Sequence, residues 1–547
     1  MQAGTGNDVM TGATPASAPA SAPAPAPTPA AAPGGPGGAV RWPVAAAMLL
    51  LALLPLVAAP VLPLIDFYNH IGRFQVLATL ADNPLFAANY APAWAVLPNI
   101  LLDVIAVAAL QIVPLAVLPH LLAALILSVL FGGILALNRA ITGQARWPAL
   151  LLALPLLYSW ILNWGFAGFL LGLGLGLLGA AWWLGQRGRP VRRLGLALVL
   201  AAAIFFCHAL AFGLYGILIA SLEVGHWWQQ RPRKLAVLAG GLAQCAVQAA
   251  VPAFLFLQSR TAAAADGVSN ADESLARLRA QGLLMDRLAE LAVQRVETII
   301  RVAEGPSYPA DALWLALLLG LLALAFRRRA LLLSPMVAVA AAAAIMLVLV
   351  MPPALFGSGY VSDRMPLFLA LVLVAGIMPG PGRLPVLLPG LAALAGARLL
   401  MVAVQWHGTA ADLADFDAVV QALPPGQVVA GLPVRATPHE DMPGRCEMYP
   451  PLLLVRHGHA TPLFAIRTAQ PLALRGRLAA AHDELAARPP GPGARNHSEQ
   501  LVAAYARAGY PYLLLCQVAA DRPLPQTPYP MVAQAGRFRL LRLAPEQ

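Results

Sequence analysis

Residues 63–73, PLIDFYNHIGR, bring polar and ionisable side chains together directly after a long apolar run. Asp66 is a carboxylate of the kind that takes a proton in general acid–base catalysis. His70 follows four residues later, so in a helix both side chains would share a face. Arg73 carries the forked guanidinium that binds phosphate through two hydrogen bonds. We therefore predict a catalytic pair, Asp66 and His70, beside a phosphate-binding Arg73.

Each of these assignments has a structural alternative. A carboxylate at a helix end also forms local ion pairs, and Arg73 is near enough in sequence to be the partner of Asp66. His70 is equally consistent with an aromatic ring packed at the membrane interface. An arginine at the end of an apolar run often reaches for lipid headgroups rather than for a substrate.

Other polar residues stand where further apolar runs end. His208 lies in FFCHALAFG, Asn163 in SWILNWGF, and both Asp363 and Arg364 lie in GSGYVSDRM. Arg364 is a second candidate for binding phosphate, and the other three, together with Asp82, are candidates for binding substrate. Ion-coupled transporters usually need ionisable groups near the bilayer midplane, whereas here these groups collect at the ends of the runs. The pattern favours an enzyme at the membrane–water boundary.

The composition places the chain in a bilayer. It has 547 residues, of which 59% are hydrophobic and 11% charged, and its mean hydropathy is +0.70. A soluble domain carries about 25% charged residues. The net charge of +11 comes almost entirely from arginines in short clusters between apolar runs, so it indicates membrane topology rather than nucleic-acid binding.

If all of the arginine clusters face the cytoplasm, they determine the direction in which each apolar run crosses the membrane. The sequence then predicts about eleven spans, with the N-terminus inside and the C-terminus outside. The expected spans are 42–65, 119–138, 147–162, 166–185, 194–207, 209–224, 235–257, 310–326, 330–351, 364–379 and 384–405.

These spans divide the chain into three parts. Residues 1–41 are rich in Pro, Ala and Gly and are expected to be a disordered cytoplasmic tail. Residues 42–406 form the membrane domain, with a first external loop at 66–118 and an external amphipathic helical region at 258–309. Residues 407–547 form a small α/β domain on the periplasmic side.

One apolar stretch is excluded from this count. Residues 97–118 are apolar enough to span, but they contain Pro98, Pro114 and Asp103, and counting them would put basic clusters outside. We expect this stretch to lie along the outer membrane surface. Asp103 is then a weak site candidate, since it can pair within its own helix.

The last domain alternates strand-like and helix-like segments. The expected strands are 428–432, 462–466, 512–518 and 537–543, and the expected helices are 412–422, 475–488 and 498–508. Cys446 and Cys516 are the only cysteines of this domain, which would occupy an oxidising compartment, so we predict a disulfide between them. The alternative is that each cysteine is buried separately.

Several of these segments together resemble the GT-C glycosyltransferases. The matching stretches are DFYNHIGR, LPNILLD, WGFAGFLLGLGLGL, CHALAF and SDRMP, within an architecture that extends over 42–547. The resemblance implies a bacterial inner-membrane enzyme that transfers a sugar from a polyprenyl-phosphate donor, with inversion, to a glycolipid, cell-envelope glycan or protein. It also implies that Asp66 is the general base.

Metal-dependent members of this superfamily hold a divalent ion between paired acidic residues. Here Asp66 stands alone and Asp82 follows at a distance, so we predict no metal ligand, although the resemblance leaves Mg²⁺ or Mn²⁺ open. Two other functions stay open as well: a lipid-glycan flippase or transporter, and a non-catalytic membrane assembly partner.

Overall fold

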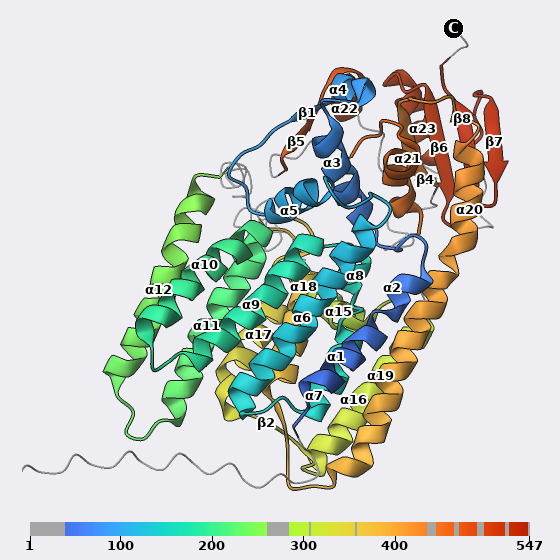
Figure 1. Cartoon of the computed structure of the whole chain (residues 1–547). Coiled ribbons are helices and arrows are strands. Elements are labelled where there is room, and N and C mark those ends of the chain that lie inside the picture. Colours follow the sequence, from blue (N-terminus) through green and yellow to red (C-terminus); the bar gives the residue numbers. More distant parts are fainter. Residues whose placement is uncertain are drawn as a thin grey trace, which may run out of the picture. The chain divides into compact units, whose positions relative to one another are not determined.

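The computed structural model describes residues 39–259, 284–305, 308–355, 358–434, 445–463, 470–488, 497–519 and 524–544. Nearly all of the expected disordered tail, and the first half of the expected external region 258–309, lie outside these residues. Within the described part, helices dominate (Figure 1).

The first half of the chain is almost entirely helical. Its elements are α1 (Trp42–Ala52), α2 (Leu54–Ala58), α3 (Phe67–Thr79), α4 (Pro84–Asn89), β1 (Tyr90–Pro92), α5 (Leu101–Ala109), α6 (Leu118–Thr142), α7 (Trp147–Leu156), α8 (Trp160–Asn163), α9 (Ala167–Gly185), α10 (Pro190–Cys207), α11 (Ala209–Gln229) and α12 (Leu235–Leu257).

The second half adds the remaining helices of the bundle. They are α15 (Leu284–Ile300), η2 (Arg301–Ala303), α16 (Tyr308–Arg327), η3 (Pro335–Val337), α17 (Ala338–Val350), α18 (Val361–Gly376) and α19 (Leu384–His407), with the short paired strands β2 (Leu331–Leu333) and β3 (Ile377–Pro379) between them.

The C-terminal part alternates helices and strands. Its elements are α20 (Thr409–Val420), β4 (Val429–Val434), η4 (Arg445–Met448), α21 (Tyr449–His457), β5 (Leu472–Leu474), α22 (Gly476–Ala487), α23 (His497–Arg507), β6 (Tyr512–Gln517), β7 (Met531–Ala535) and β8 (Phe538–Arg542).

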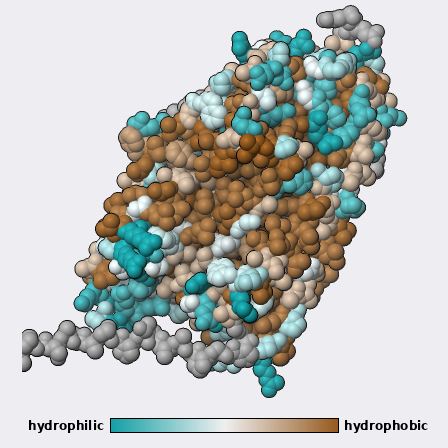
Figure 2. Space-filling model, in the orientation of Figure 1, coloured by the Kyte–Doolittle hydropathy of each residue, from teal (hydrophilic) through white to brown (hydrophobic). Residues whose placement is uncertain are grey.

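Seven helical segments among the described residues are long and apolar enough to cross a membrane. Figure 2 shows apolar residues over the middle of the bundle, with hydrophilic residues gathered toward its two ends. Helices satisfy their own backbone hydrogen bonds, which is what a hydrocarbon environment demands. The chain is therefore a multi-pass membrane protein, and the predicted fold class, a mainly α membrane bundle with a small α/β domain, is confirmed.

The other four expected spans are shorter or broken. The run 42–65 is divided between α1 and α2, and 147–162 between α7 and α8, while 330–351 contains η3 and α17 and 364–379 falls on the 16-residue α18. Prolines account for part of this, because Pro55 and Pro155 lie at the breaks and lack the amide that continues a helix. The count of eleven crossings stays a prediction.

The stretch 97–118 does not form a spanning helix. Only α5, nine residues long, is helical up to Ala109, and α6 begins at Leu118. A helix of nine residues covers about 14 Å, roughly half of a hydrocarbon core.

Close helix packing in the bundle uses the glycines of α9. This helix contacts α6, α10 and α11, and it is largely buried. A Cβ at Gly174 would come within 2.8 Å of the backbone nitrogen of Leu130 on α6. Small residues let apolar helices approach each other closely, which replaces the hydrophobic driving force inside a bilayer.

A four-stranded sheet with the order β4-β6-β8-β7 organises the C-terminal domain. β4 and β6 are parallel and the other neighbours antiparallel, with Leu514 opposite both Gly431 and Leu540. Three of the expected strands appear. The expected strand 462–466 does not begin at Pro462 or Leu463, and its other residues lie outside the described part, while β7 was not expected.

The first external loop and the C-terminal domain are joined. β1 pairs with β5, and the Tyr90 hydroxyl both donates to the Thr461 carbonyl (2.6 Å) and accepts from the Thr461 amide (3.0 Å). Helix α21 packs on α3, where a Cβ at Gly72 would lie 3.1 Å from Leu463. The C-terminal domain therefore rests on the helix that carries Asp66 and His70.

Candidate functional site

A cavity of about 910 Å³ lies at the end of the bundle where α3, α9, α11, α12 and α18 meet the C-terminal domain. Its walls are apolar except for a few polar side chains, which is the usual composition of a ligand site. The polar and charged residues that line it are Asp66, Asn69, His70, Asn99, His208, Ser358, Tyr360, Arg364, Glu447 and Gln470.

Backbone contacts fix the position of Asp66 at the start of α3. The amides of Ile65 and Asp66 donate to the carbonyls of Asn163 and Trp164, both at 2.9 Å. The turn can come this close because Gly165 adopts a φ of +80°, and a Cβ there would collide with the backbone of Phe67. Two segments a hundred residues apart thus hold the carboxylate in place.

The Asp66 carboxylate is directed to His70 rather than to its own helix end. It occupies the N-cap position of α3 without accepting a side-chain capping bond, and His70 Nε2 lies 3.6 Å from its Oδ2. The second carboxylate oxygen, Oδ1, is buried without a hydrogen-bond partner among the described residues. A buried carboxylate oxygen without a donor favours the approach of a hydroxyl proton.

Arg73 occupies a different place from the one expected of a phosphate ligand. It is 1% exposed and does not line the cavity. Its Nε and Nη2 donate to the two carboxylate oxygens of Asp103, at 2.6 and 3.1 Å, and its Nη2 lies 2.8 Å from His70 Nδ1. Arg73 and Asp103 thus support the far side of the His70 ring.

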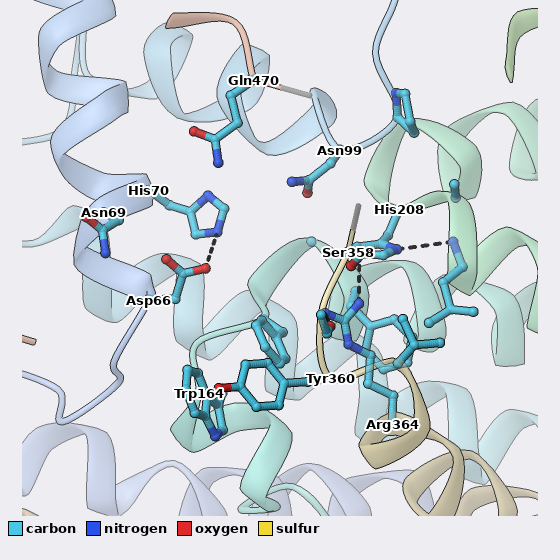
Figure 3. A pocket seen from close by; sticks show the side chains of 18 of the residues that line it. Asp66, Asn69, His70, Asn99, Trp164, His208, Ser358, Tyr360, Arg364 and Gln470 are labelled. Atoms are coloured by element: carbon cyan, nitrogen blue, oxygen red, sulfur yellow. Dashed lines mark hydrogen bonds and ion pairs between the residues drawn. The ribbon is translucent and has the colours of Figure 1, made fainter. Parts of the chain in front are cut away.

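Opposite Asp66 and His70 stands a second polar pair, His208 and Arg364 (Figure 3). The Leu210 amide donates to His208 Nδ1 (3.1 Å), which leaves the proton of a neutral ring on Nε2. Burial lowers the pKa of His208 well below its ordinary value, and the charge of Arg364 acts in the same direction. In its neutral form, the ring that accepts at Nδ1 presents an Nε2–H donor.

The N–H groups of His208 Nε2 and Arg364 Nη1 lie next to each other in the cavity. Arg364 Nη1 lies 3.0 Å from His208 Nε2, and neither group can accept from the other when the ring proton is on Nε2. Arg364 also donates to the Gly359 carbonyl (3.2 Å), and its guanidinium lies over Phe166, 4.2 Å from the ring centroid. An anion beside the two nitrogens could accept from both at once, so the pair is suited to phosphate.

Aromatic rings form one side of the cavity beside these pairs. Trp164 and Tyr360 have ring centroids 4.4 Å apart, and Phe166 stacks on Trp164 at 5.9 Å. Tyr360 has a φ of +56°, a conformation that a non-glycine residue adopts at a cost. Figure 3 shows Trp164 and Tyr360 side by side below Asp66.

Asp66, His70, His208 and Arg364 were all singled out from the sequence, and the cavity brings them together. Four other candidates do not line it: Asn163 donates to the Glu304 carbonyl (2.9 Å), Asp363 pairs with Arg301 (3.4 Å), Asp82 is exposed, and Asp103 pairs with Arg73. Asn163 still acts on the site, because its carbonyl holds Ile65.

Sequence reasoning missed several residues of the cavity. Asn69, Asn99, Trp164 and Tyr360 belong to the same short polar segments that supplied the other candidates, so their neighbourhood was a usable signal. Gln470 had no such signal, because it reaches the cavity through the pairing of β5 with β1.

The residues of the cavity do not make a metal site of the usual kind. Among the described residues, no group of three or more His, Cys, Asp and Glu side chains is placed to hold a metal ion. Within the described ranges, His70 is the ionisable side chain in contact with Asp66, and that histidine is engaged by Arg73 on its other nitrogen. The donors that the described residues offer therefore do not fit the Mg²⁺ or Mn²⁺ that the resemblance left open.

Neither a protein-family model nor a curated protein matches the chain. Among solved structures, the chain is similar to ArnT from Cupriavidus metallidurans bound to undecaprenyl phosphate, with 14% identity, a TM-score of 0.46, and coverage of 92% of this chain and 99% of ArnT. It is also similar to arabinofuranosyltransferase AftD from Mycobacteria, with 16% identity, a TM-score of 0.38, and coverage of 93% of this chain but 42% of AftD. Both likenesses are weak.

Proposed function

We propose that the chain is a membrane glycosyltransferase of the GT-C type, which moves a sugar from a polyprenyl-phosphate donor to a hydroxyl outside the cytoplasm. The observation that carries this proposal is the placement of Asp66 with His70 opposite His208 with Arg364 in one cavity. Glycosyl transfer needs such an arrangement, because the attacking hydroxyl releases a proton and the departing phosphate gains negative charge.

The donor's phosphate belongs on the side of His208 and Arg364. Both groups present N–H donors there, and Arg364 is held by contacts with Gly359 and Phe166. The adjoining wall is apolar and suits the carrier's hydrocarbon chain. It is formed by Phe205, Leu210, Phe212, Pro252, Ala253 and Phe256.

The acceptor hydroxyl belongs on the side of Asp66. Its oxygen forms a bond to the anomeric carbon as Asp66 takes its proton, and the bond from that carbon to the phosphate oxygen breaks with its electron pair. Polyprenyl phosphate leaves with a negative charge that Arg364 and His208 stabilise. Because attack and departure occur on opposite faces, the anomeric configuration inverts.

The supporting residues of α3 act through His70. His70 Nδ1 faces the Arg73 guanidinium, which only donates, so the ring proton resides on Nε2, toward Asp66. In this proposal that proton faces the carboxylate, whose Oδ2 lies 3.6 Å from Nε2. Arg73, held by Asp103, is a positioning residue, and it takes no part in binding phosphate in this proposal.

The acceptor is a glycolipid, a cell-envelope glycan or a protein on the periplasmic side of a bacterial inner membrane. This orientation rests on the arginine clusters, which put the N-terminus in the cytoplasm. The end of the bundle that holds the cavity then faces outward, together with the C-terminal domain.

The full chain in lipid nanodiscs, supplied with a panel of radiolabelled polyprenyl-phosphate sugars, tests this function. We expect at least one donor to yield polyprenyl phosphate and a labelled product. Arg364→Gln should raise the donor KM about tenfold or more, since charged hydrogen bonds are lost. The exposed Arg477→Gln is the matched control. Movement of intact donor across a membrane without bond cleavage would instead indicate a transporter.

A further inference from the structure

A second set of side chains in the cavity has no role in the steps above. Asn99 and Gln470 line the cavity, and Figure 3 shows their amide groups facing the space beside His70, across from Trp164 and Tyr360. We call Asn99 and Gln470 the amide wall. Primary amides both donate and accept hydrogen bonds, which suits an uncharged ligand with many hydroxyl groups.

The backbone holds both amides in place. Asn99 has a φ of +81°, which asparagine tolerates better than most residues, and Gly168 leaves room for it, since a Cβ there would collide with Asn99 Oδ1. Gln470 lies two residues before β5, and the residue between them, Pro471, accepts a hydrogen bond from the Ala93 amide (2.7 Å). Gln470 Oε1 is buried and has no hydrogen-bond partner among the described residues.

The charged residues that line the cavity limit where an anion can bind. Asp66 lies beyond His70 from Gln470, and Glu447 also lines the cavity from the C-terminal domain. Arg364, on the other side, is the cation that lines the cavity in the described part of the chain. A phosphorylated or carboxylated group is therefore favoured only beside Arg364, and a neutral ring is favoured beside the amide wall.

We infer that the amide wall, facing Trp164 and Tyr360, binds a neutral sugar ring of the acceptor, so that the C-terminal domain takes part in choosing the acceptor through Gln470. This inference rests on the proposed function, because only a glycosyltransferase would use the bound sugar as an acceptor. The ring extends to the side of Asp66, which must meet the attacking hydroxyl, with Gln470 above His70 and Asn99 toward His208. The aromatic rings cover its C–H face, and the amides meet its hydroxyls.

Binding of sugars can be measured without any transfer. The full chain in nanodiscs is examined by saturation-transfer NMR with neutral methyl glycosides of glucose, galactose, mannose and arabinose, and with methyl glucuronide as the charged comparison. We expect at least one neutral glycoside to bind and the glucuronide to bind more weakly. Undecaprenyl phosphate should leave the signal unchanged, because it occupies the side of Arg364.

Two variants test the amide wall itself. Gln470→Ala and Asn99→Gly, which tolerates the positive φ, should each weaken glycoside binding about fivefold, the loss expected for one hydrogen bond. Gln421→Ala, at the exposed end of α20, is the matched control. Wild-type binding by both variants, or displacement of the glycoside by undecaprenyl phosphate, would overturn the inference.

A transfer assay with methyl glycosides as acceptors separates the two partners of the reaction. Gln470→Ala should raise the acceptor KM about fivefold and leave the donor KM unchanged. A rise in the donor KM alone would assign the ring to the donor and contradict the inference. If no donor is consumed at all while the variants still lose glycoside binding, the proposed function fails and the sugar-binding wall stands.

Discussion

At the scale of residues, the site depends on which partner each polar group has. Asp66, His70, His208 and Arg364 were singled out because each stands at the end of an apolar run, and the structure brings all four to one cavity. The role of Arg73 as the partner of Asp103 could not be predicted. The pairing requires α5 to pack on α3, and the two residues are thirty positions apart in the sequence. Local spacing carries no information about such a contact.

His208 combines two roles that a substitution can separate. Its Nδ1 caps α11 by accepting from the Leu210 amide, and its Nε2–H is proposed to bind phosphate. Asparagine caps helices well, so His208→Asn should keep the thermal stability and lower donor turnover about tenfold. His208→Ala should lose the cap as well, at a cost of about 1 kcal/mol. Full activity of His208→Asn would show that the histidine is only a cap.

At the scale of elements, the short helix α5 decides the topology. The apolar stretch 97–118 holds only nine helical residues before Leu110, so the chain should stay on the outer side of the membrane there. Its hydropathy alone suggested a membrane span. Its prolines, and the requirement that all arginine clusters face the cytoplasm, predicted that it does not span. The structure contains no spanning helix in this stretch, and its place at the outer membrane surface stays a prediction.

A cysteine scan checks this topology. In a chain with Cys207 and Cys245 replaced by alanine, Gln111→Cys should react with a membrane-impermeant thiol reagent added from the periplasmic side. Gly188→Cys, exposed in the loop between α9 and α10 and free of close neighbours, should react only from the cytoplasmic side. The reverse pattern would invert the whole arrangement.

The loop after η2 should make the stability depend on pH. Burial raises the pKa of the Glu304 carboxyl from its ordinary 4.5 to about 7, although Arg301 opposes the shift. The folded chain then binds this proton more tightly than the unfolded chain, so stability should fall as pH rises from about 4.5 to 7 and level off above. Glu304→Gln should remove this part of the dependence and be more stable than wild type at pH 8.

Thermal unfolding in nanodiscs between pH 5 and 8.5 measures this effect. Glu484→Gln is the matched control, since Glu484 forms a surface pair with Arg488 (3.2 Å). Parallel curves for the wild type and Glu304→Gln would contradict the assignment.

At the scale of the whole molecule, the membrane bundle and the C-terminal domain build one site together. Composition and arginine spacing predicted the bundle, and alternating segments predicted most of the sheet. The junction between them was not predictable, because β1 and β5 are three residues each and pair across nearly 400 residues of chain. Strands that short carry no periodic signal, and therefore Gln470 could not be foreseen as a residue of the cavity.

The disulfide links two parts of the domain that closes the cavity. Cys446 lies in η4 beside Glu447, Cys516 lies in β6, and their Cα atoms are 5.6 Å apart, as the prediction of a disulfide requires. A crosslink across 70 residues stabilises by about 4 kcal/mol in the loop-closure model. Reductant should therefore lower the unfolding temperature of the wild type.

The double variant Cys446→Ser/Cys516→Ser should unfold at that lower temperature with or without reductant. The variant Cys207→Ser/Cys245→Ser, which leaves the disulfide intact, is the control for thiol effects. An unfolding temperature that reductant does not change would show that the crosslink contributes little to the domain.

Replacing Asp66 by asparagine tests the central claim most directly. Asparagine keeps the size of the side chain and cannot take a proton from the acceptor, so transfer from a radiolabelled polyprenyl-phosphate sugar should fall by about a hundredfold or more. Binding of undecaprenyl phosphate and the unfolding temperature should stay at wild-type values, because Arg364 and His208 are untouched. Transfer by Asp66→Asn at the wild-type rate would show that Asp66 is not the general base and would contradict this account.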